Sequence, residues 1–231
     1  MKANTHDMKR QMLKQLVVSV LNVRTLLALA LVVVIGGMWL SGAAYAGTVT
    51  GIAGGWGHSV ALENDGTVWT WGYNGDGELG DGTNTNRNAP VQVSGLTGVT
   101  AISDAAYHTI ALKGDGTVWT WGKNDLGQLG DGTTTNRTTP VQVSGLTGVT
   151  AIAGGQLHTI ALKGDGTVWA WGNNYFGQLG DGTTTNRTTP VQVSGLTGVT
   201  AIAGGDLHTI ALKGDGTVWA WGNNDFGKLG D

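Results

Sequence analysis

The sequence contains no cysteine, three prolines and two phenylalanines among its 231 residues. The absence of cysteine excludes a disulfide framework, a thiolate metal site and a cysteine nucleophile. The scarcity of proline excludes a collagen-like chain, although there are 41 glycines. Charged residues are also sparse, at 13%, but hydrophobic residues reach 40%, a balance typical of an ordered protein. We therefore expect an all-β fold with many tight turns.

The first 46 residues differ in composition from the rest. They carry five basic residues and one acid, and an apolar run follows from Leu26 to Leu40. The segment ends in Ala44-Tyr45-Ala46, which fits the cleavage site of a secretory signal peptide. We expect residues 1–46 to direct export, so that residues 47–231 are secreted or displayed at the cell surface. The alternative is an uncleaved single-pass membrane anchor through residues 26–40, although this run is short for a span of about 20 residues.

Removal of this segment changes the net charge. Five of the 13 basic residues and one of the 16 acidic residues lie in it, which leaves 8 basic and 15 acidic residues and a net charge of −7. An acidic domain without a basic patch is a poor candidate for binding a phosphate backbone. We expect no nucleic-acid partner.

Everything after residue 50 repeats with a period of 50 residues. The units cover 51–100, 101–150, 151–200 and, incompletely, 201–231, and the second and third differ at only nine positions. Each unit carries one histidine and one Trp-x-Trp pair: His58, His108, His158 and His208, with Trp69/Trp71, Trp119/Trp121, Trp169/Trp171 and Trp219/Trp221. A period of this size indicates a propeller or a solenoid.

Each unit contains the pattern of four short strands. In the third unit we expect strands at 150–153, 158–162, 167–171 and 190–193. The second and third are joined by Gly164-Asp165-Gly166, because Asp-Gly supplies the positive φ of a primed hairpin turn. Four strands in 50 residues favour a propeller blade over a coil of parallel β-helix, which is usually shorter.

The paired tryptophans are expected to form the core between blades. Trp169 and Trp171 are two residues apart and share one face of their strand. Packing blade on blade would place small residues opposite them, and Ala161 and Ala170 are the candidates. Burial is what aromatics at strand period usually do, so we favour a core role over a carbohydrate-stacking platform.

The segment from His158 to Thr183 reads HTIALKGDGTVWAWGNNYFGQLGDGT. It resembles the regulator of chromosome condensation repeat, which reads roughly His-Ser/Thr-x-Ala-Leu, a turn, Val-x-x-Trp-Gly-x-Asn and Gly-Gln-Leu-Gly. The resemblance covers residues 51–231 and recurs in all four units. It implies a β-propeller of four-stranded blades, usually seven to a ring.

The resemblance implies less about activity, because one fold hosts unrelated functions. The founding eukaryotic member is a nucleotide exchange factor for a small nuclear GTPase and binds chromatin. Secreted bacterial relatives include an inhibitor that grips a β-lactamase through its propeller face. A signal peptide and an acidic net charge favour the second kind.

About three and three-quarter blades are present, because the fourth unit stops at Gly230-Asp231. This number cannot close a seven-bladed ring, and an open arc leaves unpaired edges. We expect either a fragment of a longer repeat protein or, as the sharper hypothesis, self-association of two chains to close a ring.

Metal chemistry is weakly supported by the motifs. The loop 74–81 is rich in oxygen ligands, but an EF-hand starting at Asn74 would need Gly and Glu where Leu79 and Thr85 stand. The recurring Asp81, Asp131 and Asp181 are expected to accept backbone N–H bonds in their own loops. The histidines are expected to form structural hydrogen bonds at strand starts, since no acid is paired with them at fixed spacing.

Enzymatic chemistry is also weakly supported. A catalytic triad needs one serine, one histidine and one acid in one place, which nearly identical units do not supply. Neither a G-x-S-x-G elbow nor a phosphate-binding G-x-x-x-x-G-K-S/T loop occurs. We expect no catalytic residues, no cofactor and no bound metal.

The candidate binding residues come from the few positions of the repeat at which the four units, compared at equivalent residues 50 apart, carry different side chains. These variable positions flank strands or fall in two loops. Propeller loops lie on the faces of the ring, where ligands bind. Neutral drift at exposed loop positions is the competing explanation. The candidates are Trp56, Tyr73, Tyr107, Lys123, Asp125, Gln156, Tyr175, Phe176, Asp206, Asp225 and Phe226.

The favoured function is therefore a secreted or surface-exposed protein-binding module that acts through its variable loops. One alternative is an exchange-factor-like regulator of a small GTPase, which rests on the family alone. Another is a protein that binds or processes glycans, which exposed aromatics and acids keep open.

Overall fold

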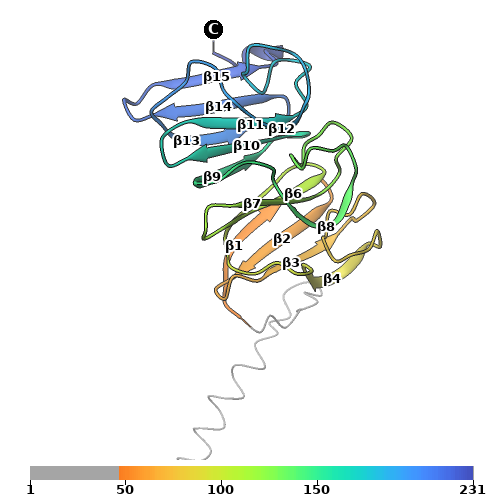
Figure 1. Ribbon diagram of the computed structural model, residues 1–231. Helices are drawn as coiled ribbons and strands as arrows, with labels where there is room; N and C mark the ends of the chain where they lie inside the picture. The colour runs from red at the N-terminus through yellow and green to blue at the C-terminus, as the bar shows by residue number, and fades with distance from the viewer. Residues whose placement is uncertain (1–46, 231) are drawn as a thin grey trace, which may run out of the picture. The chain divides into compact units, whose positions relative to one another are not determined.

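The computed structural model describes residues 47–230, which form 15 β-strands and one short 3-10 helix (Figure 1). The all-β prediction is confirmed. The predicted signal peptide or anchor at 1–46 lies outside the described residues. Within the described residues no helix has the length and apolar character needed to cross a membrane.

The strands form four antiparallel sheets, one for each repeat unit, and in each sheet the strands lie in sequence order. Three sheets have four strands, and the fourth has three. The first sheet contains β1 (Val49–Gly54), β2 (His58–Glu63), β3 (Val68–Gly72) and β4 (Arg87–Gln92), and the second β5 (Val99–Asp104), β6 (His108–Lys113), β7 (Val118–Gly122) and β8 (Arg137–Gln142). The third contains β9 (Val149–Gly154), β10 (His158–Lys163), β11 (Val168–Gly172) and β12 (Arg187–Gln192), and the fourth β13 (Val199–Gly204), β14 (His208–Lys213) and β15 (Val218–Gly222), followed by η1 (Asp225–Gly227).

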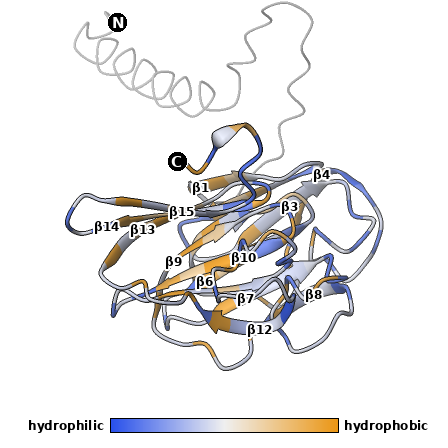
Figure 2. Ribbon diagram, turned by 90° about the horizontal axis from the view of Figure 1, so that it is seen from above, coloured by the Kyte–Doolittle hydropathy of each residue, from blue (hydrophilic) through white to orange (hydrophobic). Residues whose placement is uncertain are grey.

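These sheets are the predicted propeller blades, and the arc that they form is open. The first strands of successive blades contact one another, β1 with β5, β5 with β9 and β9 with β13, so they form the inner side of the arc. The fourth strands lie at the outer edge of each sheet. Seen from above, strands β6, β9 and β10 are strongly apolar, and hydrophilic loops surround them (Figure 2).

The fourth strand of the third unit begins three residues earlier than the predicted start at residue 190. It begins at Arg187 and not at Pro190, because Gly172 pairs with Arg187 after a register shift that follows Ala170. Pro190 lies within β12 and is tolerated because this strand is the outer edge of the sheet. The loop between the third and fourth strands therefore spans only residues 173–186.

The core consists of three apolar clusters, each shared between two successive blades. In the first cluster Trp121 of the second blade packs with Val60, Leu62 and Val68 of the first blade. The second cluster repeats this arrangement between the second and third blades, with Trp171 against Ile110, Leu112 and Val118. The third cluster repeats it between the third and fourth blades, with Ile160, Leu162 and Val168. Blades are thus held together by one tryptophan-bearing face against one aliphatic face.

The predicted small-residue face is wrong for Ala161 and correct for Ala170. Ala161 pairs directly with Trp169 in the register of β10 and β11, and opposed residues of an antiparallel pair point to the same side. Ala161 therefore lies beside the tryptophans and fills the space that they leave. The opposite face carries Ile160, Leu162 and Val168 with Ala170, so the tryptophans meet branched side chains and not a row of alanines.

Burial of the tryptophans depends on the position of the blade in the arc. Trp121 and Trp171, in the two middle blades, are fully buried. Trp219, in the last blade, is 52% exposed. The prediction of a tryptophan core is therefore confirmed for the second tryptophan of the middle pairs, whereas the first, Trp119 and Trp169, is only partly buried.

Candidate functional site

Two loops of every blade lie on the same side of the arc, because successive strands run in opposite directions. The short loop joins the first and second strands (residues 55–57), and the long loop joins the third and fourth (residues 73–86), with equivalents every 50 residues. We call this side the loop face. All eleven predicted site residues lie in these loops.

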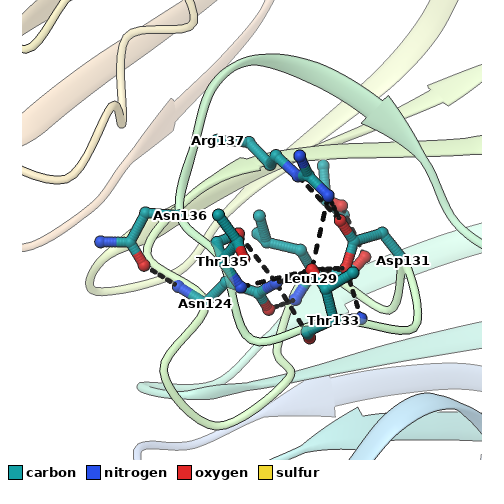
Figure 3. A network of polar contacts seen from close by, with 8 residues as sticks. Asn124, Leu129, Asp131, Thr133, Thr135, Asn136 and Arg137 are labelled. Atoms are coloured by element: carbon teal, nitrogen blue, oxygen red, sulfur yellow. Dashed lines mark hydrogen bonds and ion pairs between the residues drawn. The ribbon is translucent and has the colours of Figure 1, made fainter.

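A buried asparagine organises the long loop of each of the first three blades, and Figure 3 shows the loop of the second blade. The side-chain oxygen of Asn124 accepts the Leu129 N–H at 2.9 Å, and its Nδ2 donates to the carbonyls of Thr133 and Thr135, both at 3.1 Å. Its own N–H donates to Asn136 Oδ1 at 2.8 Å. One fully buried side chain thus satisfies backbone groups along the whole loop.

An aspartate and an arginine close the same loop. Asp131 accepts the Thr133 N–H at 2.9 Å, as predicted, and also binds Arg137, whose Nε and Nη2 lie 2.8 and 2.6 Å from Asp131 Oδ2. Burial alone would raise the pKa of Asp131, but the hydrogen bonds from Thr133 and Arg137 outweigh it and lower the pKa. The carboxylate is therefore occupied by its own loop and is not offered to a cation.

The structure brings five of the predicted residues together in one cluster on the loop face. The Trp56 ring lies 6.4 Å from that of Tyr73, edge to face, and 5.8 Å from that of Tyr107. Lys123 Nζ lies 5.8 Å from the centre of the Tyr107 ring and 3.0 Å from Asp125 Oδ2. We call Trp56, Tyr73, Tyr107, Lys123 and Asp125 the aromatic cluster.

The aromatic cluster joins two blades and remains open to solvent. Trp56 and Tyr73 belong to the first blade and are 72% and 40% exposed, and the other three residues belong to the second. The acids beside Lys123, chiefly Asp125 and then Asp76, raise the pKa of its ammonium group and keep it charged. Asp76 was not among the predicted residues, although its 3.7 Å contact with Lys123 links the long loops of both blades.

A cavity of about 290 Å³ lies next to the aromatic cluster, on the inner side of the arc. It is lined by the short loops of all four blades, and Trp56 belongs both to its wall and to the cluster. The predicted residues Gln156 and Asp206 lie in this wall, and the Gln156 N–H donates to the Asp206 carbonyl at 3.0 Å. The predicted residues at the centre of the short loops, Trp56, Gln156 and Asp206, therefore line the same cavity.

The remaining predicted residues lie apart from this site. Tyr175 and Phe176 are exposed on the long loop of the third blade, and Asp225 and Phe226 lie in η1 of the fourth. None of these four is among the described residues that line the cavity. The structure thus divides the eleven candidates into an inner group and an outer group.

Sequence reasoning missed one buried contact between a histidine and an aspartate next to the cavity. His58 Nε2 lies 2.8 Å from Asp104 Oδ1, and both side chains are almost fully buried. The statement that no acid is paired with the histidines is therefore wrong for the first blade. Burial raises the pKa of Asp104, and the hydrogen bond with His58 opposes this shift. Comparison of the repeat units could have pointed to this contact, because the second unit has Asp104 where the other three units have glycine, at Gly54, Gly154 and Gly204.

The structural role predicted for the histidines is confirmed by their hydrogen bonds. His108 Nε2 lies 2.8 Å from Thr159 Oγ1 of the next blade, and this hydroxyl donates to the Gln128 carbonyl at 2.8 Å. Because Thr159 donates its only proton to Gln128, His108 must carry its proton on Nε2. Burial lowers the pKa of His108 to about 3, so the ring is neutral at physiological pH.

The hydroxyl that contacts the His58–Asp104 pair is already used in a hydrogen bond within the fold. Thr109 Oγ1 lies 2.9 Å from His58 Nε2, but this hydroxyl is buried and donates to the Glu78 carbonyl. Among residues 47–230 no group of three or more histidine and acidic side chains could hold a metal ion. The loop face offers instead exposed rings, charges and a cavity, which are features of a binding surface.

Comparison with known proteins adds the family and the fold. The model of the RCC1-like domain matches residues 39–231. The ultraviolet-B receptor UVR8 of Arabidopsis thaliana is 44% identical over 45 residues, which cover 20% of this chain and 10% of the receptor.

Solved structures resemble most of the chain. The crystal structure of human WBSCR16 is 28% identical with a TM-score of 0.73, and the match covers 82% of this chain and 51% of that one. Prp20p from Saccharomyces cerevisiae is 23% identical with a TM-score of 0.71, covering 80% and 48%. The chain thus spans about half the length of these solved structures.

The family match extends over all four repeat units, and the similar structures share their blade architecture. Together with the recurring sequence motif, these findings confirm the predicted resemblance: the chain belongs to the RCC1-like domain family.

Proposed function

We propose that this protein is an exported, non-catalytic binding module that holds a protein partner against its loop face. The observation that carries the proposal is the aromatic cluster beside the cavity, with Trp56 72% exposed between two tyrosines. Tryptophan, tyrosine and charged side chains at the rim of a pocket are the usual anchors of protein interfaces. The family supports a binding or exchange-factor role in general and consists mostly of non-enzymatic proteins.

The charges of the loop face indicate the chemistry of the partner. Asp76, Asp125 and Asp206 lie in or next to the site, and Lys123 is occupied by two of them. An acidic surface attracts a basic patch on its partner and speeds association at low salt. We therefore expect the partner to present lysine or arginine near an apolar tip that enters the cavity.

Export is part of the proposal and is supported by the composition of residues 1–46 alone. A secreted or surface-displayed module fits the acidic character of residues 47–231, which carry a net charge of −7. Expression of the full chain with a reporter at the C-terminus, followed by fractionation, tests this part. Retention in the cytosol would contradict it.

The exchange-factor alternative has less support. The description of the Prp20p structure reports binding to Gsp1p and histones by that protein, but at 23% identity the likeness shows the fold alone. No feature of the loop face described above favours a GTPase or a glycan over another partner. Both remain alternatives that the experiment below distinguishes.

The test compares proteins that differ only on the loop face. Three proteins of residues 47–231 are immobilised separately: the wild type, the double variant Trp56→Ala/Tyr107→Ala and the control Tyr175→Ala. Proteins that each of them retains are identified by mass spectrometry. We expect a protein retained by the wild type and the control but lost from the double variant, with a dissociation constant that rises on the order of 100-fold.

The identified partner is then titrated in solution against the same three proteins. Binding that survives in the double variant, or that is lost only in the control, would place the site elsewhere. A partner that proves to be a GTPase, with accelerated nucleotide release, would favour the exchange-factor alternative. Retention of glycans but no protein would favour the glycan alternative.

A further inference from the structure

One ammonium group of the chain itself lies within the aromatic cluster. Lys123 Nζ lies 3.0 Å from Asp125 Oδ2 and 3.7 Å from Asp76 Oδ2. It also lies 5.8 Å from the centre of the Tyr107 ring. Carboxylates and the faces of aromatic rings are the groups that bind organic cations in proteins. The cluster therefore already binds an ammonium group, and Lys123 supplies it.

This contact is not part of the repeated fold. The residues equivalent to Lys123 in the other units are Tyr73, Asn173 and Asn223, so one unit alone carries a lysine there. A different lysine recurs over a tryptophan in the last three units, at 5.6, 5.7 and 5.9 Å from the ring centre, beside the hairpin between the second and third strands. That hairpin lies on the side of the arc opposite to the loop face. The recurring lysine belongs to the architecture of the blade, whereas Lys123 is particular to the candidate site.

The two carboxylates are held in place without help from Lys123. Asp76 Oδ1 accepts a hydrogen bond from Asn136 Nδ2 of the next blade at 2.9 Å. Asp125 directly follows Asn124, whose buried side chain orders the long loop of the second blade. The site would therefore keep its acids if the ammonium of Lys123 left it.

Lys123 can leave the site at little cost. Its side chain is 29% exposed and that of Asp125 is 56% exposed. An ion pair so open to water contributes little to stability, because water competes for both charges. Departure of Lys123 would leave two carboxylates and the Tyr107 ring without a cation, and such a site attracts another one.

The rings next to the acids match the stem of a lysine side chain. The Tyr107 ring, which contacts Lys123, also lies 5.8 Å from the ring of the exposed Trp56. A lysine carries an apolar stem that packs on such surfaces and a compact ammonium group with three donors at its tip. Arginine fits less well, because its planar guanidinium group favours both oxygens of one carboxylate and the acids here belong to two different loops.

We propose that the aromatic cluster is a recognition site for a lysine side chain of the partner, and that Lys123 is an internal occupant which this lysine displaces. The inference rests on the proposed function and specifies it, because it names the group that the partner must present. Lys123 then lowers the affinity for lysine and limits binding to partners that offer further contacts on the loop face.

The test vacates the site and offers a small ammonium ion. Residues 47–231, which lie within one compact unit of the chain, are prepared as the wild type and as Lys123→Ala. n-Butylammonium, which reproduces the side chain of lysine, is titrated and followed by the NMR signal of the Trp56 indole N–H, assigned with Trp56→Phe. We expect saturable shifts in Lys123→Ala, with a dissociation constant about tenfold lower than in the wild type, because the internal occupant no longer competes.

Matched controls define the chemistry of the site. Lys163→Ala removes a lysine that lies over Trp169 and 3.8 Å from Asp165, and its Trp56 signal should respond as in the wild type. n-Butanol, which has the same chain without the charge, should cause no saturable shift in Lys123→Ala. Addition of Asp76→Asn to Lys123→Ala should remove the gain in affinity.

A second variant guards against a disturbed loop. Lys123→Met keeps the length of the stem and removes the charge, and it should show a smaller gain, because its stem still occupies part of the site. Equal responses of the wild type and both Lys123 variants would overturn the proposal. A response to n-butanol as strong as that to n-butylammonium would overturn it as well, and tighter binding of n-propylguanidinium would overturn the choice of lysine.

These titrations need no partner, so they are independent of the retention experiment described above. Binding of n-butylammonium to Lys123→Ala, with no protein retained by the loop face, would support the ammonium site and contradict the proposed function. An identified partner should bind Lys123→Ala about tenfold more tightly than the wild type. A partner that requires Trp56 but binds both proteins equally would support the proposed function and contradict the lysine site.

Discussion

At the scale of single residues, the blades are joined by a chain of buried hydrogen bonds that runs from one unit to the next. Thr159 occupies the centre of one link, since its hydroxyl accepts from His108 and donates to the Gln128 carbonyl. All three groups are buried, so water cannot replace a missing partner. Hydrogen bonding within the interface therefore contributes to stability and also fixes the tautomer of the three histidines that make this bond, His58, His108 and His158.

Replacement of Thr159 by valine keeps the volume and removes the hydroxyl. We expect the free energy of unfolding to fall by about 2–4 kcal/mol, because two hydrogen bonds are lost and a donor and an acceptor are left buried without partners. Urea unfolding followed by tryptophan fluorescence measures the change. Thr134→Val, at an exposed loop position, is the matched control and should change stability by less than about 0.5 kcal/mol. Equal effects of the two substitutions would contradict the role of Thr159.

The buried histidines predict a fall in stability on mild acidification. Burial lowers the pKa of His108 to about 3 and that of His158 to about 4, whereas an unfolded histidine titrates near 6.5. The unfolded chain then binds more protons than the folded one below pH 6.5, so the contribution is complete above this pH and is lost as the pH falls toward 4. The loss is on the order of 3 kcal/mol for each histidine.

The raised pKa of Asp104 acts in the opposite direction, because its protonation on acidification is easier in the folded protein. Unfolding by urea at pH 7.0 and pH 4.5 measures the net effect. The double variant His108→Gln/His158→Gln should lose most of the difference between the two pH values, although it is less stable at pH 7.0. An unchanged pH dependence in this variant would exclude the histidines as its source.

At the scale of the element, each long loop is a folded structure with its own interior. Asn124 bonds to backbone groups at Leu129, Thr133 and Thr135, and the Asp131–Arg137 pair closes the far side. The loop therefore holds its solvent-facing side chains, including the partly buried Lys123 and the exposed Asp125, in fixed positions. Preorganisation of this kind reduces the entropy lost on binding.

Substitution of Asn124 by alanine should destabilise the protein by about 2–4 kcal/mol, since it leaves several buried backbone groups without a partner. We expect the loss to be concentrated in residues 123–137, where hydrogen exchange should become faster. Asn84→Ala is the control, because that exposed side chain makes a single bond to the Gly75 carbonyl. Uniform loss of protection across all blades would indicate that the loop has no independent role.

Sequence patterns predicted the elements well where a local rule decides them. The Asp-Gly turns were placed correctly because only glycine readily adopts the positive φ found at Gly166. The start of the fourth strand was missed because it depends on the pairing of Gly172 with Arg187, a contact between segments that no local pattern records. The facing of Ala161 was wrong for the same reason: strand alternation gives two faces, and the register between strands decides which residues share one.

The candidate site was predicted in part. Comparison of the units identified Trp56, Tyr73 and Tyr107, which vary because each contacts loop neighbours and not the repeated core. The same comparison could not tell that Tyr175 lies apart from them. Tyr175 occupies the repeat position of Asp125, one blade further along, so its separation from Trp56 depends on the blade that carries it and not on its position within the unit.

At the scale of the whole molecule, the contribution of one residue depends on the blade that carries it. Trp169 and Trp219 occupy equivalent positions, but Trp169 is partly buried and Trp219, in the last blade, is 52% exposed. Likewise Trp121 is fully buried, whereas its equivalent Trp221 in the last blade is only partly buried. Trp121 Nε1 donates to the Glu78 carbonyl at 2.8 Å, and its ring is inaccessible to solvent. Stability is therefore concentrated in the middle of the array and declines at its ends.

Truncation of Trp121 to alanine should cost about 3–5 kcal/mol, as expected for a large aromatic removed from a closed core. Trp219→Ala should cost about 1 kcal/mol or less, because half of this side chain is already in water. Thermal unfolding and urea titration measure both. Similar losses at the two positions would contradict the gradient and indicate that the last blade is as well packed as the second.

The near identity of successive units has a consequence at the level of the gene. Because the surfaces that join the first blade to the second also join the second to the third and the third to the fourth, loss or duplication of a 50-residue segment brings together two edges that already match. Recombination between homologous stretches can therefore lengthen or shorten the coding sequence by whole units without creating an untried contact. A change of any other length would shift the pattern and expose the interior. The number of repeat units can therefore change without disturbing the interfaces between blades. Features found in one place only, such as Asp104 beside His58 and the aromatic cluster, distinguish one unit from another.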